Sequence, residues 1–278
     1  FHAFLDRASP CLLYQITLLR DNVEVRPTGR LQQPMIRMNV PMATYSRKSP
    51  SADYVGLIAS YKRMHAAGFA RDTGVDGDNT DPDHAFPGQS LHRWLKHIAS
   101  LIQITESRSV LDYGSGKGRQ YEREVRDGSK VICKAIQDYW GVKSIRCFDP
   151  GVDQLDQLPD QKFDAVIATD VLEHVPESDV FWVVDELFSF ADKFVFASIP
   201  CYRAAAVLPD GRNAHITIRP PLWWLGVFQS AQSRQPHVQF STSYIIPVKG
   251  SADKKKTEYL HSFGSASLDF TLLNDPIE

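Results

Sequence analysis

The chain has 278 residues, of which 43% are hydrophobic and 23% charged, and it carries a net charge of −2. Such a composition is typical of a folded globular protein, and so small a net charge gives no field that would attract nucleic acid or an anionic membrane. The charge is uneven, because residues 1–50 hold seven Lys and Arg against three Asp and Glu. We interpret this basic stretch as a solvated arm rather than a binding surface, and we expect neither nucleic acid nor a membrane as a partner.

The cysteine pattern argues against a metal or redox site built from thiols. The four cysteines, Cys11, Cys133, Cys147 and Cys201, contain no CxxC pair. We expect them to be reduced thiols. Because the sequence also shows no signal peptide and no apolar run of membrane-spanning length, we expect a cytoplasmic protein.

The N-terminal arm, residues 1–50, precedes the part of the chain that has a regular pattern. Its second half, residues 26–50, holds four prolines and no acidic residue, and its apolar residues follow no period. These features are typical of an extended segment.

Residues 51–104 are predicted to form a helical lid or cap. Ser51 can cap a helix that Gly68 can end, and residues 90–104 have the apolar period of a second helix. Between them, residues 71–84 include the run DGDNTD, which hints at calcium ligands but lacks the glutamate that completes an EF-hand loop. We therefore expect no metal site, and whether this loop holds a cation stays open.

From residue 105 the pattern alternates between strands and helices, which predicts a doubly wound α/β fold with a mostly parallel sheet. The predicted strands cover residues 109–114, 144–151, 162–171 and 193–200. The predicted helices cover residues 117–139, 179–191 and 220–232. Residues 237–250 and 257–265 flank a lysine-rich turn, and they predict an antiparallel hairpin that closes the sheet.

The stretch SVLDYGSGKGRQY, residues 109–121, places a glycine-rich turn directly after the first predicted strand. A phosphate-binding GxxxxGK[ST] loop is excluded, because Lys117 is followed by Gly118. A dinucleotide-binding GxGxxG loop is disfavoured, because Arg119 stands at the third glycine position, and this counts against a nicotinamide-dependent oxidoreductase. What remains is the pattern DxGxGxG, formed by Asp112, Gly114, Gly116 and Gly118.

Two further motifs stand at the ends of later predicted strands. The second strand ends in CFDP, where the carboxylate of Asp149 can accept hydrogen bonds from both hydroxyls of a ribose. The third strand continues as FDAVIATDVLEHV, residues 163–175. Together with the DxGxGxG loop, these motifs resemble, in the same order, those of the class I S-adenosylmethionine-dependent methyltransferases over residues 105–232.

The resemblance implies a Rossmann-like methyltransferase domain over residues 105–278 that binds S-adenosylmethionine (SAM) and releases S-adenosylhomocysteine (SAH). In this interpretation Asp112 places negative charge near the ammonium group of SAM, and Asp149 holds the ribose. The glycines let the backbone approach the ligand without a Cβ clash. The implied cofactor-binding residues are Asp112, Gly114, Ser115, Gly116, Gly118, Asp149, Pro150, Leu158, Asp170 and Val171.

The sequence departs from the family pattern between Asp149 and Phe163. The intervening residues are too few for the helix and the strand that the family places there. We therefore expect a sheet that is abbreviated after its second strand, and we expect Asp156, Gln157 and Leu158 to take over the adenine contact, with Leu158 as the candidate cofactor-binding residue.

Methyl transfer to a hydroxyl or an amine needs an aligned acceptor and a group that takes up the acceptor's proton. His215, which follows a Pro-Asp-Gly turn after the fourth strand, is the favoured base, and Asp170 and His174 are further catalytic candidates. The candidate acceptor-binding residues are Asn213, Glu173, Trp224 and His65. Packing or simple solvation is the alternative interpretation for the histidines, and a place in the core is the alternative for the tryptophan.

We therefore expect a SAM-dependent methyltransferase that acts, without a metal, on an oxygen or nitrogen atom of a small-molecule or glycan-like acceptor. RNA methylation, with residues 1–50 holding phosphate, is one alternative. A SAM-binding protein without catalytic activity is another, because fold and cofactor do not prove catalysis. The sequence leaves the acceptor and the oligomeric state open.

Overall fold

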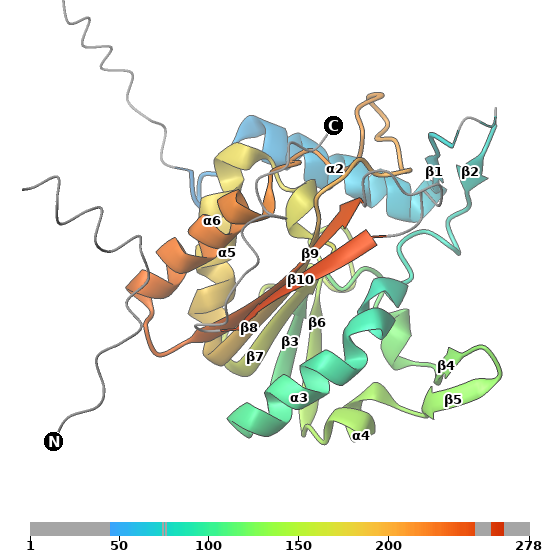
Figure 1. The fold of residues 1–278 in the computed structure, drawn as a ribbon. Coiled ribbons are helices and arrows are strands. Elements are labelled where there is room, and N and C mark those ends of the chain that lie inside the picture. The colour runs from blue at the N-terminus through green and yellow to red at the C-terminus, as the bar shows by residue number, and fades with distance from the viewer. Residues whose placement is uncertain (1–44, 74, 76, 248–256, 264–278) are drawn as a thin grey trace, which may run out of the picture. The chain divides into compact units, whose positions relative to one another are not determined.

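The computed structural model describes residues 45–247 and 257–263, with the exception of residues 74 and 76 (Figure 1). Most of the predicted arm, the lysine-rich turn of the closing hairpin and Cys11 therefore lie outside the described residues. Among the described cysteines, Cys133, Cys147 and Cys201 are all free thiols.

The centre of the fold is a six-stranded sheet with the order β10-β9-β8-β7-β3-β6. Five neighbouring strands run parallel, and β10 pairs antiparallel with β9 at one edge. The strands are β3 (Ser109–Tyr113), β6 (Ser144–Phe148), β7 (Phe163–Thr169), β8 (Ala191–Pro200), β9 (Gln239–Pro247) and β10 (Thr257–Phe263). The predicted parallel sheet with an antiparallel closing hairpin is confirmed.

The strand order is that of a doubly wound, Rossmann-like sheet with one strand missing. In the usual order 3-2-1-4-5-6, the strands β6, β3, β7, β8 and β9 take positions 2, 1, 4, 5 and 6. Residues 149–162, where the third strand would stand, form turns and irregular structure, so the predicted abbreviation is confirmed. The chain order reverses between β3 and β7, and open α/β sheets bind ligands beside this point, outside the carboxyl ends of the strands.

Two layers of helices cover the sheet (Figure 1). Helices α3 (Leu95–Thr105) and α4 (Ile136–Trp140) pack on one face, and α5 (Glu177–Phe190) and α6 (Pro221–Arg234) pack on the other. Strand β7 shows why both faces are apolar. Ala165 and Ile167 join the cluster under α3 and α4, whereas the alternate residues Val166 and Ala168 join the cluster under α5 and α6.

The segment after the glycine loop differs from its prediction. Instead of one helix over residues 117–139, the structure has a short 3₁₀ turn η2 (Arg119–Tyr121), a hairpin of β4 (Val125–Asp127) and β5 (Lys130–Cys133), and then α4. The hairpin loop is Gly-Ser, and Gly128 has a φ of 57°. A two-residue Gly-Ser loop between short apolar runs is a hairpin signal, and here turn chemistry overrides helix propensity.

The predicted lid, residues 51–104, divides into two parts with different places in the fold. Helix α2 (Ala52–Ala67) begins at Ser51, whose side chain accepts a hydrogen bond from the Tyr54 N–H, and ends at Gly68. It lies across the carboxyl ends of the strands, followed by the small strands β1 (Phe69–Ala70) and β2 (Asn79–Thr80) (Figure 1). The second predicted helix starts as a 3₁₀ helix η1 (Gln89–Trp94) without a side-chain cap, continues as α3 and packs on the sheet face, so it is not part of a lid.

The end of the predicted arm is anchored in the folded unit by Arg47. Its Nε donates to Glu186 Oε2 at 2.9 Å, and its Nη2 donates to the Tyr113 hydroxyl at 2.6 Å. The guanidinium also lies over the Trp182 ring, 4.9 Å from its centroid. Residues 45–50 therefore contribute to the packing of β3 and α5 instead of forming an extended arm.

Candidate functional site

A cavity of about 870 Å³ lies at the carboxyl ends of the parallel strands. Loops after β3, β6, β7 and β8 form its floor and sides, and α2 and the segment before α3 form its cover. The sequence-predicted residues that line it are Gly114, Ser115, Gly116, Asp149, Pro150, Asp170, Val171, His174, His215 and His65. The structure therefore brings most of the candidate cofactor, catalytic and acceptor residues together around one space.

On one side of the cavity, which we call the glycine-loop side, residues 114–118 approach two other segments closely. Gly114 has a φ of 78°, and a Cβ there would lie 2.5 Å from Val171 Cγ2. Gly116 has a φ of 58°, and a Cβ there would lie 2.6 Å from the Phe86 carbonyl oxygen. Both the backbone conformation and the available space therefore require glycine at these two positions.

Asp149 stands beside the glycine loop with its carboxylate fixed by backbone groups. Its Oδ2 accepts from the Gly116 N–H at 2.7 Å, and its Oδ1 accepts from the Gly151 N–H at 2.8 Å. Burial raises the pKa of this carboxyl to about 6. Each carboxylate oxygen keeps further lone pairs, so the side chain can still accept hydrogen bonds from a ligand in the cavity.

Asp112 lies behind the cavity wall instead of in it. Its Oδ2 accepts from Gln120 Nε2 at 3.0 Å and from the Tyr121 hydroxyl at 2.8 Å, and its Oδ1 has no partner. Burial raises its pKa to about 7. Asp112 was expected to act on the ligand directly or through water, and the geometry offers no direct contact. Gln120, whose buried Oε1 is unpartnered, lines the cavity in its place, and sequence reasoning missed it.

The cover of the cavity is aromatic and is tied to the glycine loop. The ring of Phe86 lies 4.7 Å from that of His65 and 5.7 Å from that of Tyr61. Burial lowers the pKa of His65 to about 4, and its Nδ1 has no partner. Below this cover, the Lys117 N–H donates to the Phe86 carbonyl at 3.4 Å, and Arg119 Nη1 donates to the Asp83 carbonyl at 2.7 Å.

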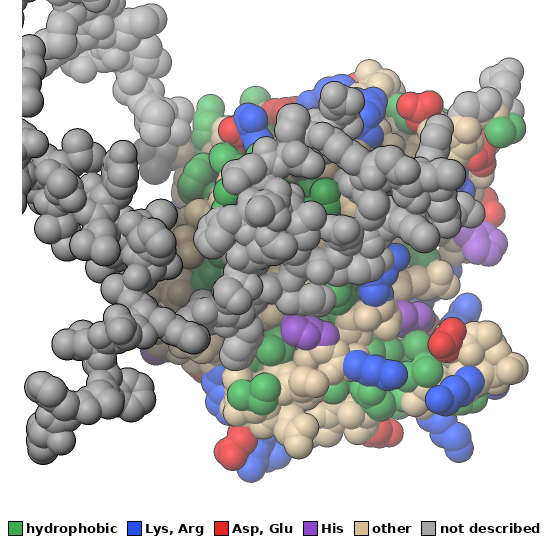
Figure 2. Space-filling model, in the orientation of Figure 1, with side chains coloured by type: hydrophobic (Ala, Val, Ile, Leu, Met, Phe, Trp, Pro, Cys, Tyr) green, Lys and Arg blue, Asp and Glu red, His purple; other side chains and the backbone are tan. Residues whose placement is uncertain are grey.

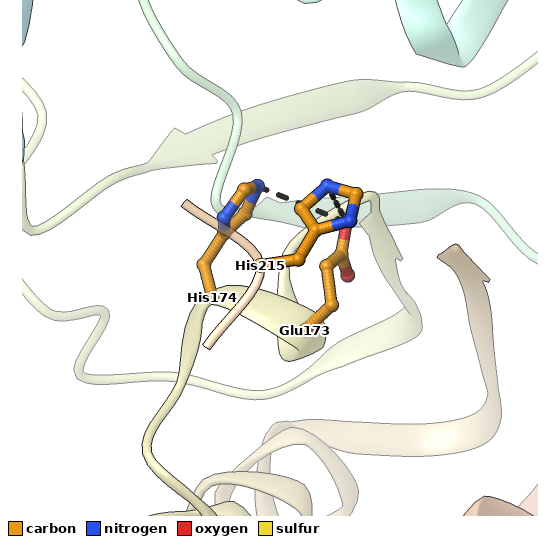
Figure 3. A group of neighbouring side chains, drawn as sticks. All are labelled: Glu173, His174 and His215. Carbon is orange, nitrogen blue, oxygen red and sulfur yellow. Dashed lines mark ion pairs between the residues drawn. The ribbon is translucent and has the colours of Figure 1, made fainter. Parts of the chain in front are cut away.

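On the opposite side of the cavity, which we call the histidine side, Glu173, His174 and His215 converge (Figure 3). Glu173 and His174 lie in the 3₁₀ turn η3 (Leu172–His174) after β7, and His215 comes from the long loop after β8. The Nε2 atoms of His174 and His215 lie 3.7 and 3.8 Å from Glu173 Oε1. One ligating atom from each of the three side chains lies within 4.8 Å of those of the other two.

The hydrogen-bond partners of Nδ1 identify the tautomer of both histidines. His174 Nδ1 lies 2.8 Å from the Ala214 carbonyl oxygen, and His215 Nδ1 lies 2.5 Å from the Tyr202 carbonyl oxygen. Because a carbonyl oxygen can only accept, each Nδ1 carries the proton and each Nε2 keeps its lone pair. Burial lowers the pKa of both histidines, that of His174 to about 3, which keeps the rings neutral. Two neutral imidazoles thus present lone pairs toward Glu173.

The carboxyl group of Glu173 is completely buried, and neither of its oxygens has a hydrogen-bond partner among the described residues. Burial raises the pKa of Glu173 well above its ordinary value, and the nearby carboxyl of Asp170 raises it further. Asp170, by contrast, accepts a hydrogen bond from Ser198 Oγ at 2.7 Å and adopts a φ of 57°. A buried carboxyl group without a hydrogen-bond partner is costly, so the described residues leave the histidine side incomplete.

Several predicted site residues do not line the cavity. Leu158 is 41% exposed, whereas Pro150 and Gly151 reach the cavity beside Asp149. Trp224 is fully buried in the core under α5 and α6, which excludes the expected place in an acceptor pocket. Gly118 and Glu173 stand behind residues that line the cavity.

Asn213 stabilises a loop close to the cavity. Its side chain donates to the Ala204 carbonyl at 2.7 Å and accepts from the Ala204 and His215 N–H groups at 2.9 and 3.1 Å. It thereby fixes the loop that carries His215, and it does not itself line the cavity as the acceptor contact would require.

A second cavity, of about 640 Å³, lies between the carboxyl-terminal ends of α3 and α4, away from the predicted site residues. On the face in Figure 2, the Lys and Arg side chains of the described residues are interspersed with Asp, Glu and uncharged ones. Within the described ranges, none of the helices has both the length and the apolar character that a membrane crossing requires.

Chemically, the site combines a carboxylate poised beside a glycine loop with two neutral imidazoles across the same cavity. The first can accept hydrogen bonds from a polar ligand, and the second can take up a proton or coordinate a cation. A scan against models of known protein families and a search of curated proteins both found no match for the chain.

Proposed function

We propose that the chain is a SAM-dependent methyltransferase that binds SAM in the cavity and transfers its methyl group to an oxygen or nitrogen atom of a small-molecule or glycan-like acceptor. SAH is the second product. The cavity volume lies near the upper end of the range of about 300–1,000 Å³ for ligand sites, which suits a cofactor and an acceptor side by side.

The hydrogen bonding of the glycine loop carries the proposal. Every backbone N–H of residues 114–118 already donates to an acceptor of the protein. These acceptors are the Phe148 carbonyl for Gly114 and Ser115, Asp149 for Gly116, the Phe86 carbonyl for Lys117 and the Ser115 carbonyl for Gly118. A loop that binds phosphate instead presents free N–H groups to its ligand. The loop therefore suits a nucleoside ligand without phosphate, and SAM is such a ligand.

The charges around the glycine loop also favour a ligand without phosphate. Asp149 lines the cavity and Asp112 lies directly behind it, so two carboxyl groups flank the place where a dinucleotide would put its pyrophosphate. Their negative charge would repel an anion, whereas SAM carries a cationic sulfonium and a cationic amino group. The ribose of SAM offers two hydroxyls to Asp149, a pairing that a carboxylate can accept in bidentate form.

Methyl transfer is an in-line displacement in which the acceptor atom forms a bond to the methyl carbon as the bond from carbon to sulfur breaks. Sulfur keeps the electron pair and becomes the neutral thioether of SAH. Alignment of the two reactants can supply most of the acceleration. The acceptor must also lose a proton, and His215 is the favoured base among the histidines that line the cavity. Burial lowers the pKa of His174 to about 3 and that of His65 to about 4, which makes both of them weaker bases.

Calorimetry with SAM and SAH tests the proposal. We expect micromolar binding to the unmodified chain, and at least tenfold weaker binding to Asp149→Asn, a loss of about 1.4 kcal/mol. The amide that this substitution introduces would turn an N–H group toward a backbone N–H and lose one of the two fixing hydrogen bonds. Asp153→Asn is the matched control, because Asp153 is exposed and pairs only with Lys62, 2.6 Å away.

Two further titrations distinguish the competing functions. Tighter binding of NAD than of SAM would overturn the proposal in favour of a dinucleotide enzyme, for which the strand order alone would also be suitable. SAM binding without SAH formation across oxygen and nitrogen acceptors would point to a binding protein without catalysis. Salt-dependent binding of RNA that is lost on removal of residues 1–50 would favour RNA methylation.

A further inference from the structure

The histidine side of the cavity brings together three side chains that can each offer a metal ligand, with their ligand atoms within 4.8 Å of one another. The Nε2 atoms of His174 and His215 and the carboxylate of Glu173 all converge, and their separations of 3.7 and 3.8 Å are too long for hydrogen bonds. A proton on Glu173 would therefore not satisfy the two imidazoles. A cation placed among the three groups would satisfy all of them at once.

We propose that Glu173, His174 and His215 bind a divalent transition-metal ion. In a tetrahedral site with metal–ligand distances of about 2.1 Å, neighbouring ligand atoms lie about 3.4 Å apart. The two separations from Glu173 Oε1 are within a few tenths of an ångström of that value. The third separation, between the two histidine ligand atoms, is at most 4.8 Å, so the side chains must rotate to bring all three ligands to the metal.

The outer contacts of the ligands have the form that metal-binding histidines require. Each Nδ1–H donates to a backbone carbonyl, of Ala214 or of Tyr202, and this orients Nε2 toward the metal position. The Tyr61 hydroxyl lies 2.7 Å from His174 Nδ1 and adds a second contact. The backbone carbonyl of Glu173 accepts from the Thr217 N–H at 2.9 Å, which joins the two ligand-bearing segments.

The donor set selects the class of metal. Two imidazole nitrogens and one carboxylate oxygen favour zinc, iron, cobalt or manganese over magnesium and calcium, which prefer oxygen ligands throughout. Three protein ligands leave at least one coordination position open. Because His174 and His215 both line the cavity, the open position would face the space that holds the acceptor.

This position deepens the proposed methyl transfer, and the role that follows rests on that proposal. Once His174 and His215 coordinate the metal, their Nε2 atoms can no longer act as bases, so this role replaces the one assigned to them above. A hydroxyl group of the acceptor would coordinate the metal, which lowers the pKa of a bound oxygen so that its proton passes to water. The resulting alkoxide oxygen would form the bond to the methyl carbon as the carbon–sulfur bond breaks, and SAH would leave with the electron pair. The site therefore favours an oxygen acceptor over a nitrogen acceptor.

Metal titrations of the whole chain, stripped with EDTA, test the proposal. We expect one equivalent of Zn²⁺ or Co²⁺ to bind with submicromolar affinity, and Co²⁺ to give visible absorption bands that report nitrogen and oxygen ligands. Mg²⁺ should bind at least 100-fold more weakly. Glu173→Gln and His215→Asn should each weaken Zn²⁺ binding at least 100-fold.

Matched controls are available on the surface. His237→Asn changes an exposed histidine, and Glu177→Gln changes an exposed glutamate that pairs with Arg219. Both variants should keep the affinity of the unmodified chain. Equal affinity in all four variants, or no stoichiometric Zn²⁺ binding to the unmodified chain, would overturn the proposal.

A measurement on the unmodified chain keeps the test independent of how well the variants fold. Zn²⁺ should raise the melting temperature by mass action, and EDTA should reverse the rise. No shift at saturating Zn²⁺ would contradict a native metal site. A parallel SAM titration separates the two proposals: SAM binding without metal binding would remove only the metal site, and metal binding without SAM binding would remove only the methyltransferase.

Discussion

Each side of the cavity holds a buried carboxyl group, but the two groups differ in their hydrogen bonding. On the glycine-loop side, both oxygens of Asp149 accept backbone N–H groups. On the histidine side, neither oxygen of Glu173 has a partner. The difference teaches that the Asp149 carboxylate is already fixed before a ligand arrives, whereas the described residues leave the Glu173 carboxyl group without a hydrogen-bond partner. A neutral sugar suits the first, and a cation suits the second.

The two sides also differ in how they are assembled. Asp149 and Gly116 are held together by the pairing of the neighbouring strands β3 and β6, because both follow the ends of those strands directly. His215 reaches Glu173 through a long loop whose path is fixed by Asn213 and by backbone contacts. The glycine-loop side is therefore a product of the sheet, and the histidine side is a product of loop packing.

The largest expected effect on ligand affinity comes from a substitution that disrupts only the glycine-loop side. In Gly116→Ala the new Cβ would meet the Phe86 carbonyl oxygen at 2.6 Å, so the cover of the cavity must move. We expect SAM binding to fall at least 100-fold while Co²⁺ binding on the histidine side is kept. Calorimetry and cobalt absorption on the same sample measure both.

Gly128→Ala is the matched control for this change. Gly128 has a φ of 57°, close to the 58° of Gly116, but no atom lies within 4 Å of the Cβ that it would gain. Both variants carry the cost of a left-handed residue, about 1–2 kcal/mol, but only Gly116→Ala moves the cover. Equal SAM affinity in the two variants would show that the close approach of Phe86 is irrelevant to binding.

A smaller effect, of about tenfold, is expected from pH. Burial raises the pKa of Asp149 to about 6 from an ordinary 3.8, and the ionised form is the better acceptor for two hydroxyls. SAM affinity should therefore rise about tenfold between pH 5 and pH 7.5. The stability of the unliganded protein should respond with the opposite sign. Between the two pKa values the folded state holds a proton that the unfolded state has released, so this contribution to stability falls as pH rises.

Asp149→Asn separates the titration of Asp149 from that of Asp112. Asp112 has a pKa that burial raises to about 7, so a second transition remains near neutral pH in the variant. Calorimetry across the pH range should show that the transition near pH 6 is lost. An identical pH profile in the two proteins would contradict the assignment to Asp149.

The smallest effect on ligand affinity is expected for a substitution of Trp224, which lies on neither side of the cavity. Because its side chain is fully buried under α5 and α6, Trp224→Phe should cost about 1–2 kcal/mol of unfolding free energy. SAM and Co²⁺ affinities should stay within twofold of those of the unmodified chain. Urea denaturation and calorimetry measure the two quantities, and a large loss of acceptor or SAM binding at full stability would restore the tryptophan to the site.

The sheet and the glycine-loop side could be predicted from the sequence because their signals are local. Each motif follows a strand, and the carboxyl ends of parallel strands meet at one edge, so Gly114 and Asp149 had to come together. The segment after the loop was predicted wrongly as a helix, although its Gly-Ser turn carries a hairpin signal.

The histidine side could be predicted only residue by residue. Glu173, His174 and His215 were each candidates, but their meeting depends on the path of a long loop, which no periodicity encodes. A metal site was not expected because the cysteine spacing and the Asp-rich loop were the only ligand patterns that the sequence displayed. Likewise, no pattern tells that Gln120 rather than Asp112 reaches the cavity.

We expect the contacts between the cover and the glycine loop to affect the rate of ligand release as well as the affinity. The Phe86, Asp83 and Pro82 carbonyls accept hydrogen bonds from the Lys117 N–H, Arg119 and the Lys117 side chain. These bonds tie the cover of the cavity to the glycine loop, so we expect a ligand beneath the cover to leave faster when they are lost. Slow release of a product is a common limit on turnover. Under the proposed methyl transfer, loss of the Lys117 side chain should therefore shorten the residence time of SAH and raise the turnover rate.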